Sequence, residues 1–415
     1  MRIAVVGAGI SGLVAAYLLE REHEVTVFEA ASKPGGHTNT IRVDTEYETH
    51  HVDTGFIVFN DRNYPTFERL LTRLGVASQP SQMSFGVSDA TGRFEYSSAS
   101  ANGLFATRAH LVSPGFHRML ADVRRFQREA RELLIGNSGA PTLGEWLERL
   151  GFSRAFVDRV IVPQASAVWS ADPRQMWTFP ARFLAGFFDN HGMLHLRDRP
   201  KWKTVSGGSQ TYVDALTASF AHRIRAGRPV AAIQRHETYV TITPRGGEPE
   251  EFDHVILAVH SDQALRMLAD ASDREHEILA SIPYQPNEAV LHTDRGLLPR
   301  RRLAWASWNY HLGGESTGRT RVTYHMNRLQ SLSADREFCV TLNRSEAIDP
   351  DTVIKTIEYS HPVYTARGAL AQKRHAEISG TARTHYCGAY WGWGFHEDGV
   401  VSALRVCERL GAHLP

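Results

Sequence analysis

One short stretch near the start of the chain restricts the fold more than any other. The apolar run Ile3 to Val6 leads into GAGISG, where Gly7, Gly9 and Gly12 have the spacing GxGxxG, and an apolar helical pattern follows. A strand that feeds a glycine turn and then a helix directs the free N–H groups of that helix at a pyrophosphate. The first glycine permits the turn, the second lets phosphates approach, and the third lets helix and strand pack closely. This order predicts a Rossmann-like dinucleotide-binding unit.

Five further positions extend this unit. Glu29 follows the apolar stretch VTVF about 20 residues after the glycines, where a carboxylate accepts hydrogen bonds from ribose hydroxyls. The double glycine Gly35 and Gly36 in KPGGHTNT allows a second close approach of backbone to the cofactor. The stretch HVDTGFIVFND is expected to bring Asp53 and Gly55 back toward the nucleotide. A nicotinamide site has no need of the second glycine pair, so these features favour FAD.

The C-terminal stretch HYCGAYWGWGFHEDGVVSAL points to the same cofactor. It combines a short strand, four glycines including Gly388, and a helix expected to begin near Gly399. Such a helix aims its positive end at what precedes it, and a flavin gains negative charge at N1 and the C2 carbonyl on reduction. FAD therefore accounts for both ends of the chain.

Composition excludes several classes of protein. A chain of 415 residues is too long for one ordinary core, so two or three domains are expected. The 46 basic and 45 acidic residues nearly balance, which gives no sign of a nucleic-acid partner. Three cysteines show neither a disulfide framework nor metal-ligand spacing, and no signal sequence precedes the first strand, so we expect a cytoplasmic protein without a metal. No apolar run reaches about 18 residues, which excludes a spanning helix but leaves peripheral contact with the inner membrane open.

Several motifs in order resemble the flavin-containing amine oxidase superfamily, which includes monoamine oxidases, protoporphyrinogen oxidase and phytoene desaturases. These motifs are the opening glycines with Glu29, the PGG that follows, VSGGSQTYVDAL, FDHVILAV and GAYWGWGFHEDGVVSA. Within the superfamily, VDTGFIVFNDRNYP and WASWNY resemble a bacterial group of FAD-dependent oxidoreductases whose genes often lie beside cyclopropane-fatty-acyl synthase-like methyltransferases. The resemblance implies an α/β (α+β overall) fold, with a Rossmann-like FAD-binding domain and a discontinuous substrate domain.

The resemblance also assigns roles to individual residues. The opening glycines, Glu29 and the double glycine would hold ADP and pyrophosphate, and the backbone of Val230 in RPVAAIQR would meet the adenine. The flavin and its ribityl chain would lie against four residues of the C-terminal stretch, namely Gly388, Asp398, Gly399 and Val400. This chain has His37 where relatives commonly have arginine, and Ala389 where they have an acidic residue. We place His37 in the cofactor site and expect FAD to be held non-covalently.

We expect three pieces of the chain, residues 1–75, 203–265 and 375–415, to form the FAD-binding domain, and residues 76–202 and 266–374 to form the substrate domain. In the latter, SPGFHRMLADVRRFQREARELLIG has the pattern of an amphipathic helix. The segment 176–196 is unusually aromatic and could be either core or the wall of a substrate tunnel.

In a flavin enzyme the protein must orient the substrate and exclude water from the site, and it does not need a nucleophilic side chain. Trp391 and Trp393 lie in the glycine-rich run that should pass the flavin, so they are candidate lining residues. Relatives that oxidise amines use a strand lysine, but the corresponding stretch NEAVLHTDRGLL has none. His292 stands there as a candidate base, although a histidine on an apolar strand is more often structural.

These features together predict an FAD-dependent oxidoreductase that dehydrogenates an apolar substrate, for which a fatty acyl chain of a lipid, modified by a methyltransferase of the same pathway, is the leading candidate. Three alternatives remain: an amine or polyamine oxidase, a non-redox binder like the Rab GDP-dissociation inhibitors, and an isomerase like UDP-galactopyranose mutase. The sequence gives no oligomeric state.

Overall fold

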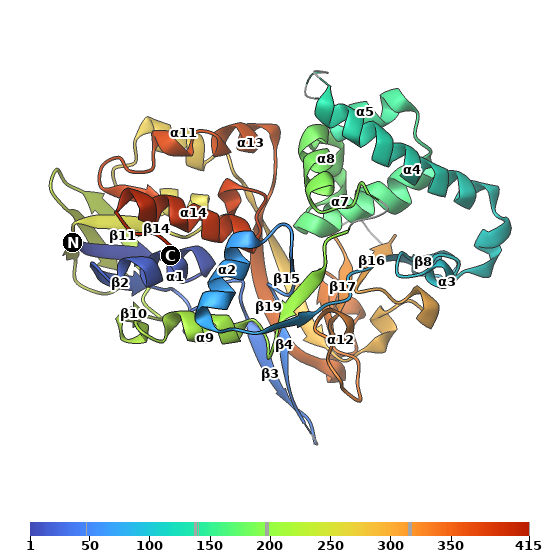
Figure 1. Cartoon of the computed structure of the whole chain (residues 1–415), viewed down its shortest axis with the longest axis horizontal. Helices are drawn as coiled ribbons and strands as arrows, with labels where there is room; N and C mark the ends of the chain where they lie inside the picture. Colours follow the sequence, from blue (N-terminus) through green and yellow to red (C-terminus); the bar gives the residue numbers. More distant parts are fainter. Residues whose placement is uncertain (47, 137–138, 140, 196–198, 314–317, 415) are drawn as a thin grey trace.

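The computed structural model describes residues 1–414 apart from 47, 137–138, 140, 196–198 and 314–317. Two parts stand side by side, with both chain ends in the same one (Figure 1). The part with the chain ends is built on a parallel sheet, and the other on a larger mixed sheet under a layer of helices. The fold class expected from the sequence is thus confirmed.

The parallel sheet has five strands in the order β10-β2-β1-β14-β20, and every neighbouring pair is parallel. The central strands β1 and β14 are apolar after their first residue because both faces of the sheet are covered. Their bounds are β10 Ile224–Arg225, β2 Glu24–Phe28, β1 Arg2–Val6, β14 His254–Leu257 and β20 Thr384–Tyr386.

Each face of the parallel sheet has its own core. Ile3 and Val5 of β1 face one core and Ala4 and Val6 the other, as the alternation of side chains along a strand requires. The first core is covered by α1 Ile10–Leu19, α2 Pro65–Leu74, α9 Gln210–Thr217 and α14 His396–Arg409. The second is covered by β11 Val230–Arg235, β12 Val240–Pro244, β13 Glu250–Phe252, α10 Ser261–Met267, α11 Asp273–Leu279 and α13 Ala366–Gln372. The helix expected from VSGGSQTYVDAL is α9.

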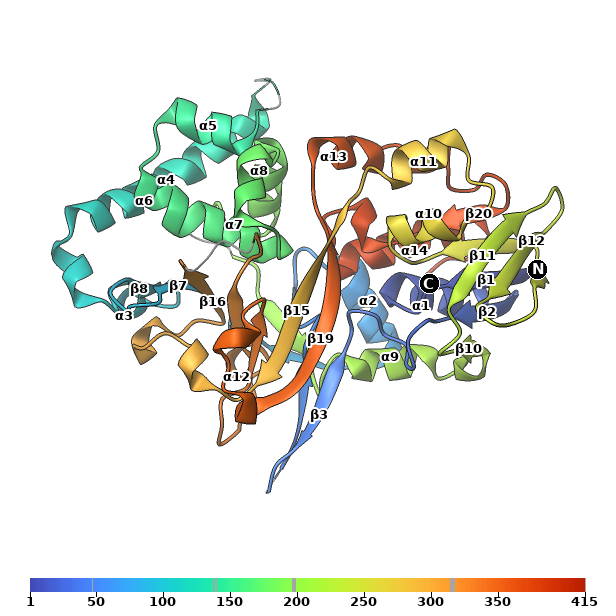
Figure 2. The ribbon, with the colours of Figure 1, turned by 180° about the vertical axis from the view of Figure 1, so that it is seen from behind.

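The second part holds a seven-stranded sheet in the order β19-β15-β18-β17-β16-β7-β8, in which β16 and β7 alone are parallel neighbours. The strands β15 and β19 are its longest, and they reach back between the two parts (Figure 2). The strand bounds are β19 Val353–Pro362, β15 Tyr284–His292, β18 Cys339–Leu342, β17 Val322–His325, β16 Trp308–Leu312, β7 Phe85–Asp89 and β8 Glu95–Ser97.

Helices cover one face of this sheet and share a large apolar core with it. The long amphipathic helix expected from the sequence is α4, which buries Phe116, Phe126 and Leu133. The helices are α3 Ala101–Leu104, α4 Pro114–Ile135, α5 Leu143–Leu150, α6 Arg154–Phe156, α7 Val162–Trp169, α8 Ala181–Asn190 and the short α12 Met326–Leu329 beside the strands. Two small sheets join the parts, one of β3 Thr40–Asp44 and β4 Thr49–Asp53, the other of β5 Phe59–Asn60, β9 Trp202–Val205 and β6 Ser78–Pro80.

The predicted division into domains stays a prediction, but the cores suggest other boundaries. Helix α11, Ile282 and Ala371 pack in a core of the parallel sheet. We therefore place the boundaries of the FAD-binding pieces near residue 283 and near residue 365 rather than at 265 and 375.

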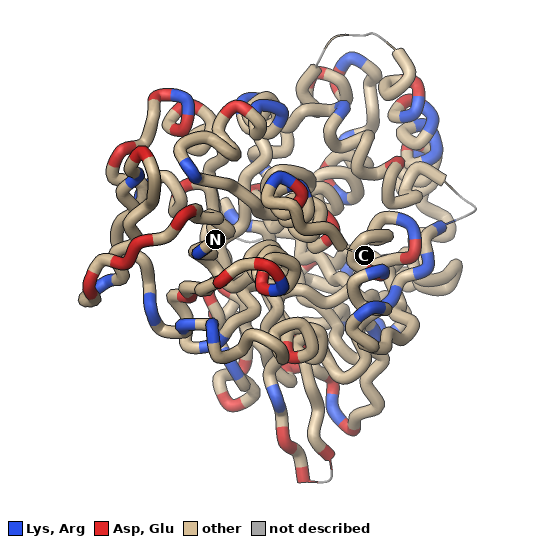
Figure 3. The backbone as a smooth tube through the Cα atoms, turned by 60° about the vertical axis from the view of Figure 1, so that its left-hand side comes forward, with Lys and Arg blue, Asp and Glu red and all other residues tan. Residues whose placement is uncertain are grey.

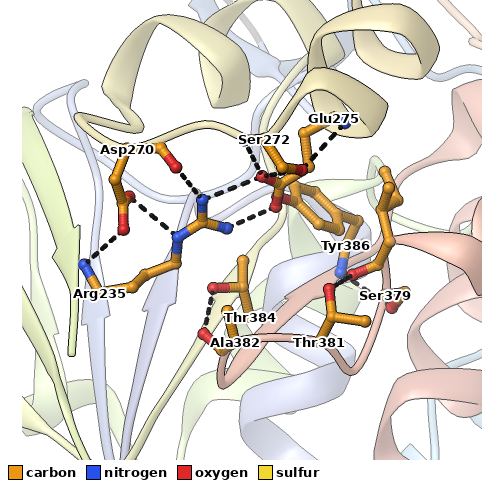
Figure 4. Close-up of polar contacts among 10 residues, drawn as sticks. Arg235, Asp270, Ser272, Glu275, Ser379, Thr381, Ala382, Thr384 and Tyr386 are labelled. Atoms are coloured by element: carbon orange, nitrogen blue, oxygen red, sulfur yellow. Dashed lines mark hydrogen bonds and ion pairs between the residues drawn. The ribbon is translucent and has the colours of Figure 1, made fainter. Parts of the chain in front are cut away.

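A buried charge network fastens three elements of the cofactor domain (Figure 4). Arg235 at the end of β11 donates to both carboxylate oxygens of Glu275 on α11, and the side chains of both are almost completely buried. The Tyr386 hydroxyl on β20 and the Ser272 amide donate to the same carboxylate. Burial alone would raise the pKa of Glu275, but these hydrogen bonds outweigh it and lower that pKa to about 2.

Charges of both signs are spread over the surface, and blue and red segments alternate along many elements in Figure 3. Among the described residues, no helix is both long enough and apolar enough to cross a membrane.

Candidate cofactor and substrate site

The glycine turn after β1 is as tight as its sequence predicts. Gly7 has a φ of +103°, and a Cβ there would lie 2.7 Å from the Ala258 carbonyl oxygen on the neighbouring strand segment. A Cβ on Gly12 would lie 1.9 Å from the Gly7 carbonyl oxygen, so no side chain fits between turn and helix. A Cβ on Gly9, in contrast, would meet nothing within 4 Å. Gly9 therefore borders open space, as expected where a phosphate approaches.

Helix α1 starts at this open space with its first amides free. Its N-cap is Gly9, which provides no side chain to cap it, and its first turn has no acidic residue. The first N–H groups of a helix have no partner within the helix and carry the positive end of its dipole. The start of α1 can therefore bind an anion such as a pyrophosphate.

The double glycine lines the same space. Gly35 pairs with Gly9 in a parallel bridge, and its amide donates to the Ala8 carbonyl at 2.8 Å. Gly35 and Gly36 both have positive φ values, +132° and +60°, which only glycine adopts readily. Gly36 is exposed, and a Cβ on it would lie 3.1 Å from the Cα of Gly9.

Glu29 and Val230 lie side by side at the edge of this turn. The Glu29 carboxylate, directly after β2, accepts from the amides of Ala8 and Ala31 at 2.7 and 2.8 Å. The Arg228 amide donates to the Glu29 carbonyl, which places the start of β11, and with it Val230, beside Glu29. The partly exposed carboxylate thus has its place fixed by backbone amides at the edge of the glycine turn.

The start of α14 adjoins the start of α1. A Cβ on Gly399 would lie 2.8 Å from a methyl carbon of Ile10, so the two helices touch at their first turns. The predicted start near Gly399 is three residues late, because α14 begins at His396. Val400 is fully buried in the core, and the Gly388 amide donates to Ser402 Oγ at 3.1 Å.

Asp398 points into its own turn. Its carboxylate accepts from the Phe395 amide at 3.0 Å, and a Cβ on Gly392 would collide with it. Burial raises the pKa of Asp398 to about 6, against hydrogen bonds from the Phe395 and Trp393 amides. Asp398 therefore shapes the glycine-rich turn from within, and its contact with the ribityl chain stays a prediction.

His396 has a structural role, which its side chain performs. Its Nε2 lies 3.0 Å from Thr38 Oγ1 and 2.9 Å from the Tyr212 hydroxyl, and its ring stacks on Phe56 at 3.5 Å. Burial lowers the pKa of His396 to about 3, so the ring is neutral. This cluster ties the double-glycine loop to α9 and α14.

His37 carries an unused ring nitrogen. Its ring stacks on Tyr359 of β19 with centroids 4.9 Å apart, and a Cβ on Gly55 would lie 2.1 Å from the His37 carbonyl oxygen. Its Nε2 is buried and meets no hydrogen-bond partner among the described residues. Burial, followed by the neighbours His361, His260 and His396, lowers the pKa of His37 well below its ordinary value. A neutral imidazole with a free nitrogen beside Gly36 can donate to or accept from a polar cofactor atom.

Asp53 differs from expectation, because protein groups occupy its carboxylate. It accepts from the Ser209 amide and hydroxyl, from Thr40 Oγ1 and from Gln330 Nε2, at distances from 2.5 to 3.1 Å. Burial raises the pKa of Asp53 to about 6 despite these donors. Asp53 thus joins β4, the start of α9 and the second domain, which corrects its predicted role at the nucleotide.

Aromatic side chains fill the junction of the two domains beyond the glycine-rich turn. Phe395 stacks on Phe187 of α8 with centroids 5.3 Å apart, and Trp169 Nε1 donates to the Trp393 carbonyl at 3.1 Å. Trp393 therefore lies at the junction, and its role in lining a substrate site stays a prediction. Much of the segment 176–196 is core, although its last residue, 196, lies outside the described residues.

Tyr364 is the residue of this junction that the sequence did not indicate. It follows β19 and packs on Phe183 with centroids 5.2 Å apart. A Cβ on Gly394 would lie 2.5 Å from its hydroxyl oxygen, which is buried and without a partner among the described residues. Burial raises the pKa of Tyr364 well above its ordinary value, so it is a neutral donor. No pattern in SHPVYT marks this tyrosine, because only the end of β19 brings it to the glycine turn.

Trp391 lies apart from Trp393. It is buried in a core of the parallel sheet, edge-on to His375 at 4.6 Å and beside Tyr390 at 5.0 Å. Trp391 and Trp393 belong to one tight turn, but their side chains face different domains. The structure thus gives Trp391 a packing role in this core rather than the predicted role of lining the substrate site.

His292 is on the wrong face of its strand for catalysis. Its neighbours Ala289 and Leu291 on β15 alternate toward the large core under the helices, and His292 points to the opposite face. Its Nδ1 accepts from the Asp294 amide at 3.1 Å, so its Nε2–H donates to Thr341 Oγ1 at 2.7 Å. Burial lowers the pKa of His292 to about 4. This contradicts the proposal of a base near the flavin.

We accordingly expect His292→Ala to lower the free energy of unfolding by about 1–3 kcal/mol, since two buried groups lose their partner. The rate of flavin reduction should not change. Chemical denaturation and anaerobic stopped-flow measure the two quantities separately, and His292→Gln, which keeps one hydrogen bond, should show an intermediate stability. Slower flavin reduction at unchanged stability would restore the catalytic role.

A comparison with protein-family models shows to which family the chain belongs. The model of the family described as flavin containing amine oxidoreductase matches residues 10–325. The chain belongs to this family.

Among curated proteins, a 29% identical relative is assigned as the flavin-containing monoamine oxidase AofH of Mycobacterium tuberculosis, matched over 62% of this chain and 56% of its own length. The flavin-dependent L-tryptophan oxidase RebO of Lentzea aerocolonigenes is 25% identical over 64% of this chain and 57% of its own. The chain spans about half the length of these relatives.

Solved structures of the flavin amine oxidoreductase fold match nearly the whole chain. Cyclohexylamine oxidase from Brevibacterium oxydans has a TM-score of 0.69 at 16% identity, over 99% of both chains. A CLA-producing fatty acid isomerase from P. acnes has a TM-score of 0.66 at 17% identity, over 98% of both. At this identity the likeness shows the fold alone.

The residues of the site fit the flavin cofactor of the family. The open space at Gly9, the uncapped start of α1 and the exposed Gly36 lie together along the glycine turn. The Nε2 of His37, the next residue, is buried and has no partner among the described residues. The junction around Trp393 and Tyr364 lies beyond this turn, where the flavin ring would meet a substrate. His292, Trp391 and Asp53 are outside this arrangement.

Proposed function

We propose that the protein is an oxidoreductase that holds FAD non-covalently and dehydrogenates an apolar substrate by hydride transfer to the flavin. A flavin, when bound, accepts a hydride from carbon or nitrogen, and the hydride carries both electrons of the oxidation. The chain's own part is to bind the diphosphate at α1, the ribose at Glu29 and the adenine at the backbone of Val230. The aromatic junction then excludes water and orients the substrate.

The observation that favours an apolar substrate is the lining of the junction. The residues of β15 that face the large core are Asn287, Ala289 and Leu291, without a lysine or a carboxylate. The opposing helices contribute aromatic rings, among them Trp169, Phe183 and Phe187. Such a surface gains free energy by covering an alkyl chain and offers an ammonium group no carboxylate from β15.

A fatty acyl chain of a lipid is the substrate class we propose on these grounds. That a fatty acid isomerase has the same fold is compatible with this proposal. The methyltransferase inferred from the resemblance would act earlier in the same pathway.

An amine or amino acid oxidase is the second candidate, because AofH and RebO are the named relatives. The absence of lysine from the stretch NEAVLHTDRGLL speaks against this chemistry.

The test is the visible spectrum of the purified protein during anaerobic additions. We expect a flavin band near roughly 450 nm that bleaches with total bacterial phospholipid and not with putrescine, cyclohexylamine or L-tryptophan. Acid precipitation should release the yellow chromophore into the supernatant. Bleaching by an amine alone would establish the second candidate, and a colourless protein that takes up no FAD would favour the non-redox binder.

A further inference from the structure

One end of the substrate domain carries an unusual surface, which we call the arginine tip and define as residues 90–118 and 295–305. It comprises β8, α3, the start of α4 and the loops beside them, at the end of the molecule opposite the N-terminus (Figures 1 and 2). A Cβ on Gly103 of α3 would lie 3.0 Å from the Leu303 carbonyl oxygen. His117 of α4 is hydrogen-bonded to the Leu111 carbonyl at 2.8 Å. The two sequence segments thus form one continuous surface.

Large apolar side chains are exposed on this tip. Leu303 is 49% exposed, Leu111 51% and Val112 83%. They are three of the eight large apolar side chains that are exposed among the described residues. Exposed apolar side chains that gather on one surface mark an interaction site, whereas scattered single ones need no explanation.

The charges around these side chains are almost all positive. The tip contains seven arginines, namely Arg93, Arg108, Arg118, Arg295, Arg300, Arg301 and Arg302. Its single acidic residue, Glu95, is buried and accepts from the amides of Arg300 and Arg301 and from the Arg301 side chain.

The acidic residues that border the tip are also engaged in local structure. Asp89 accepts from Thr91 and from the Arg93 amide, and Asp122 is buried and accepts from the Ser153 amide. Asp294 accepts from the amides of Gly296 and Asp349. These carboxylates keep their charges, but the seven arginines outnumber them together with Glu95, so the tip has a positive net charge, although the chain as a whole is nearly neutral.

A hollow completes the surface. It is lined by Arg295, Arg300, Arg302 and Trp305, and the Arg302 guanidinium lies 5.4 Å from the Trp305 ring centroid. Arginines around a hollow suit a phosphate, and tryptophan and arginine are typical of the interface between water and lipid headgroups.

We propose that the arginine tip docks the protein on an anionic phospholipid surface. Leu303, Leu111 and Val112 enter the headgroup region, the arginines face the negative lipids, and a lipid phosphate occupies the hollow. Apolar insertion combined with several basic side chains is what holds a peripheral protein on a bilayer without a spanning helix. The inference rests on the surface alone and not on the proposed substrate.

The test is co-flotation of the flavin-loaded protein with vesicles of phosphatidylcholine, with and without phosphatidylglycerol. We expect binding only to the vesicles with phosphatidylglycerol, and loss of that binding at high salt. The double variants Leu303→Asp/Val112→Asp and Arg300→Glu/Arg302→Glu should each bind at least about tenfold more weakly. Matched controls in other parts of the surface, Leu370→Asp and Arg69→Glu/Arg149→Glu, should bind like wild type.

Flavin absorbance and the thermal transition of each variant confirm that it is folded. Equal binding to both kinds of vesicle, or unchanged binding by the tip variants, would overturn the proposal. Salt-sensitive binding to duplex DNA without binding to vesicles would also overturn it. A dimer that is detected by light scattering and that dissociates in the tip variants would do the same. Flavin reduction by detergent-dispersed substrate reports on the proposed function separately, because it does not need a membrane.

Discussion

Replacing Gly9 by alanine is expected to strip the flavin from the protein while leaving the apoprotein fully folded. A Cβ at Gly9 meets no atom of the chain within 4 Å, and the backbone at φ −77° suits any residue. The added methyl group instead occupies space at the start of α1, where the pyrophosphate would lie. Overpacking a close contact costs about 1–3 kcal/mol, which corresponds to an affinity lower by about 5- to 150-fold.

The matched control for this experiment is Gly12→Ala. Its Cβ would lie 1.9 Å from the Gly7 carbonyl oxygen, so this variant must displace either the turn or helix α1. We expect it to lower the stability of the apoprotein as well as flavin retention. Flavin titration and thermal unfolding of the apoproteins distinguish the two variants. If Gly9→Ala kept full flavin occupancy in dilute solution, the assignment of the glycine turn to the cofactor would be wrong.

The second large effect is expected from Glu275. Glu275→Ala leaves the Arg235 guanidinium, whose side chain is 6% exposed, without its bidentate partner, and the Tyr386 hydroxyl without its acceptor. Removal of one member of a buried ion pair costs about 3–5 kcal/mol, and the ion pair that Arg235 keeps with Asp270 at 2.9 Å places the expected loss near the lower end of this range. We expect this loss in the free energy of unfolding measured with urea. The exposed ion pair of Arg154 and Asp158 provides the control, since Asp158→Ala should cost less than about 1 kcal/mol.

The same network predicts a dependence of stability on pH. The folded pKa of Glu275 is about 2, below its ordinary value of 4.5. Its contribution is therefore complete above about pH 4.5 and is lost as the pH falls toward 2. Wild type should lose more stability over this interval than Glu275→Ala. If the free energy of unfolding fell equally with pH in the two proteins across this interval, the role of the network would be contradicted.

The sequence was sufficient to predict the parts of the site that depend on local geometry. Gly7, Gly12 and Gly35 stand where backbone sterics permit no other residue, so their spacing carries the information by itself. The long helix α4 follows in the same way from its apolar periodicity. Local patterns of this kind do not depend on what the rest of the chain does.

The expectations for individual side chains that the structure does not support depended on where a strand or turn faces. His292 lies on an apolar strand, but only the pairing of β15 with β18 shows which face it takes. Trp391 and Trp393 belong to one turn and enter different cores. The carboxylate of Asp53 is occupied by Ser209 and Gln330, which are distant in the sequence. Tyr364 was missed for the same reason, because tertiary structure alone brings it to Gly394.

The contact between α1 and α14 affects how the protein is made. Nine of the ten residues of α1 are buried, and α14, which covers part of this helix, is encoded near the other end of the chain. During synthesis the ribosome must therefore add residues 20–409 before α1 is fully covered and the cofactor site is complete. We expect the nascent chain to expose an apolar helix while these residues are added, which makes it a client for chaperones and delays cofactor loading.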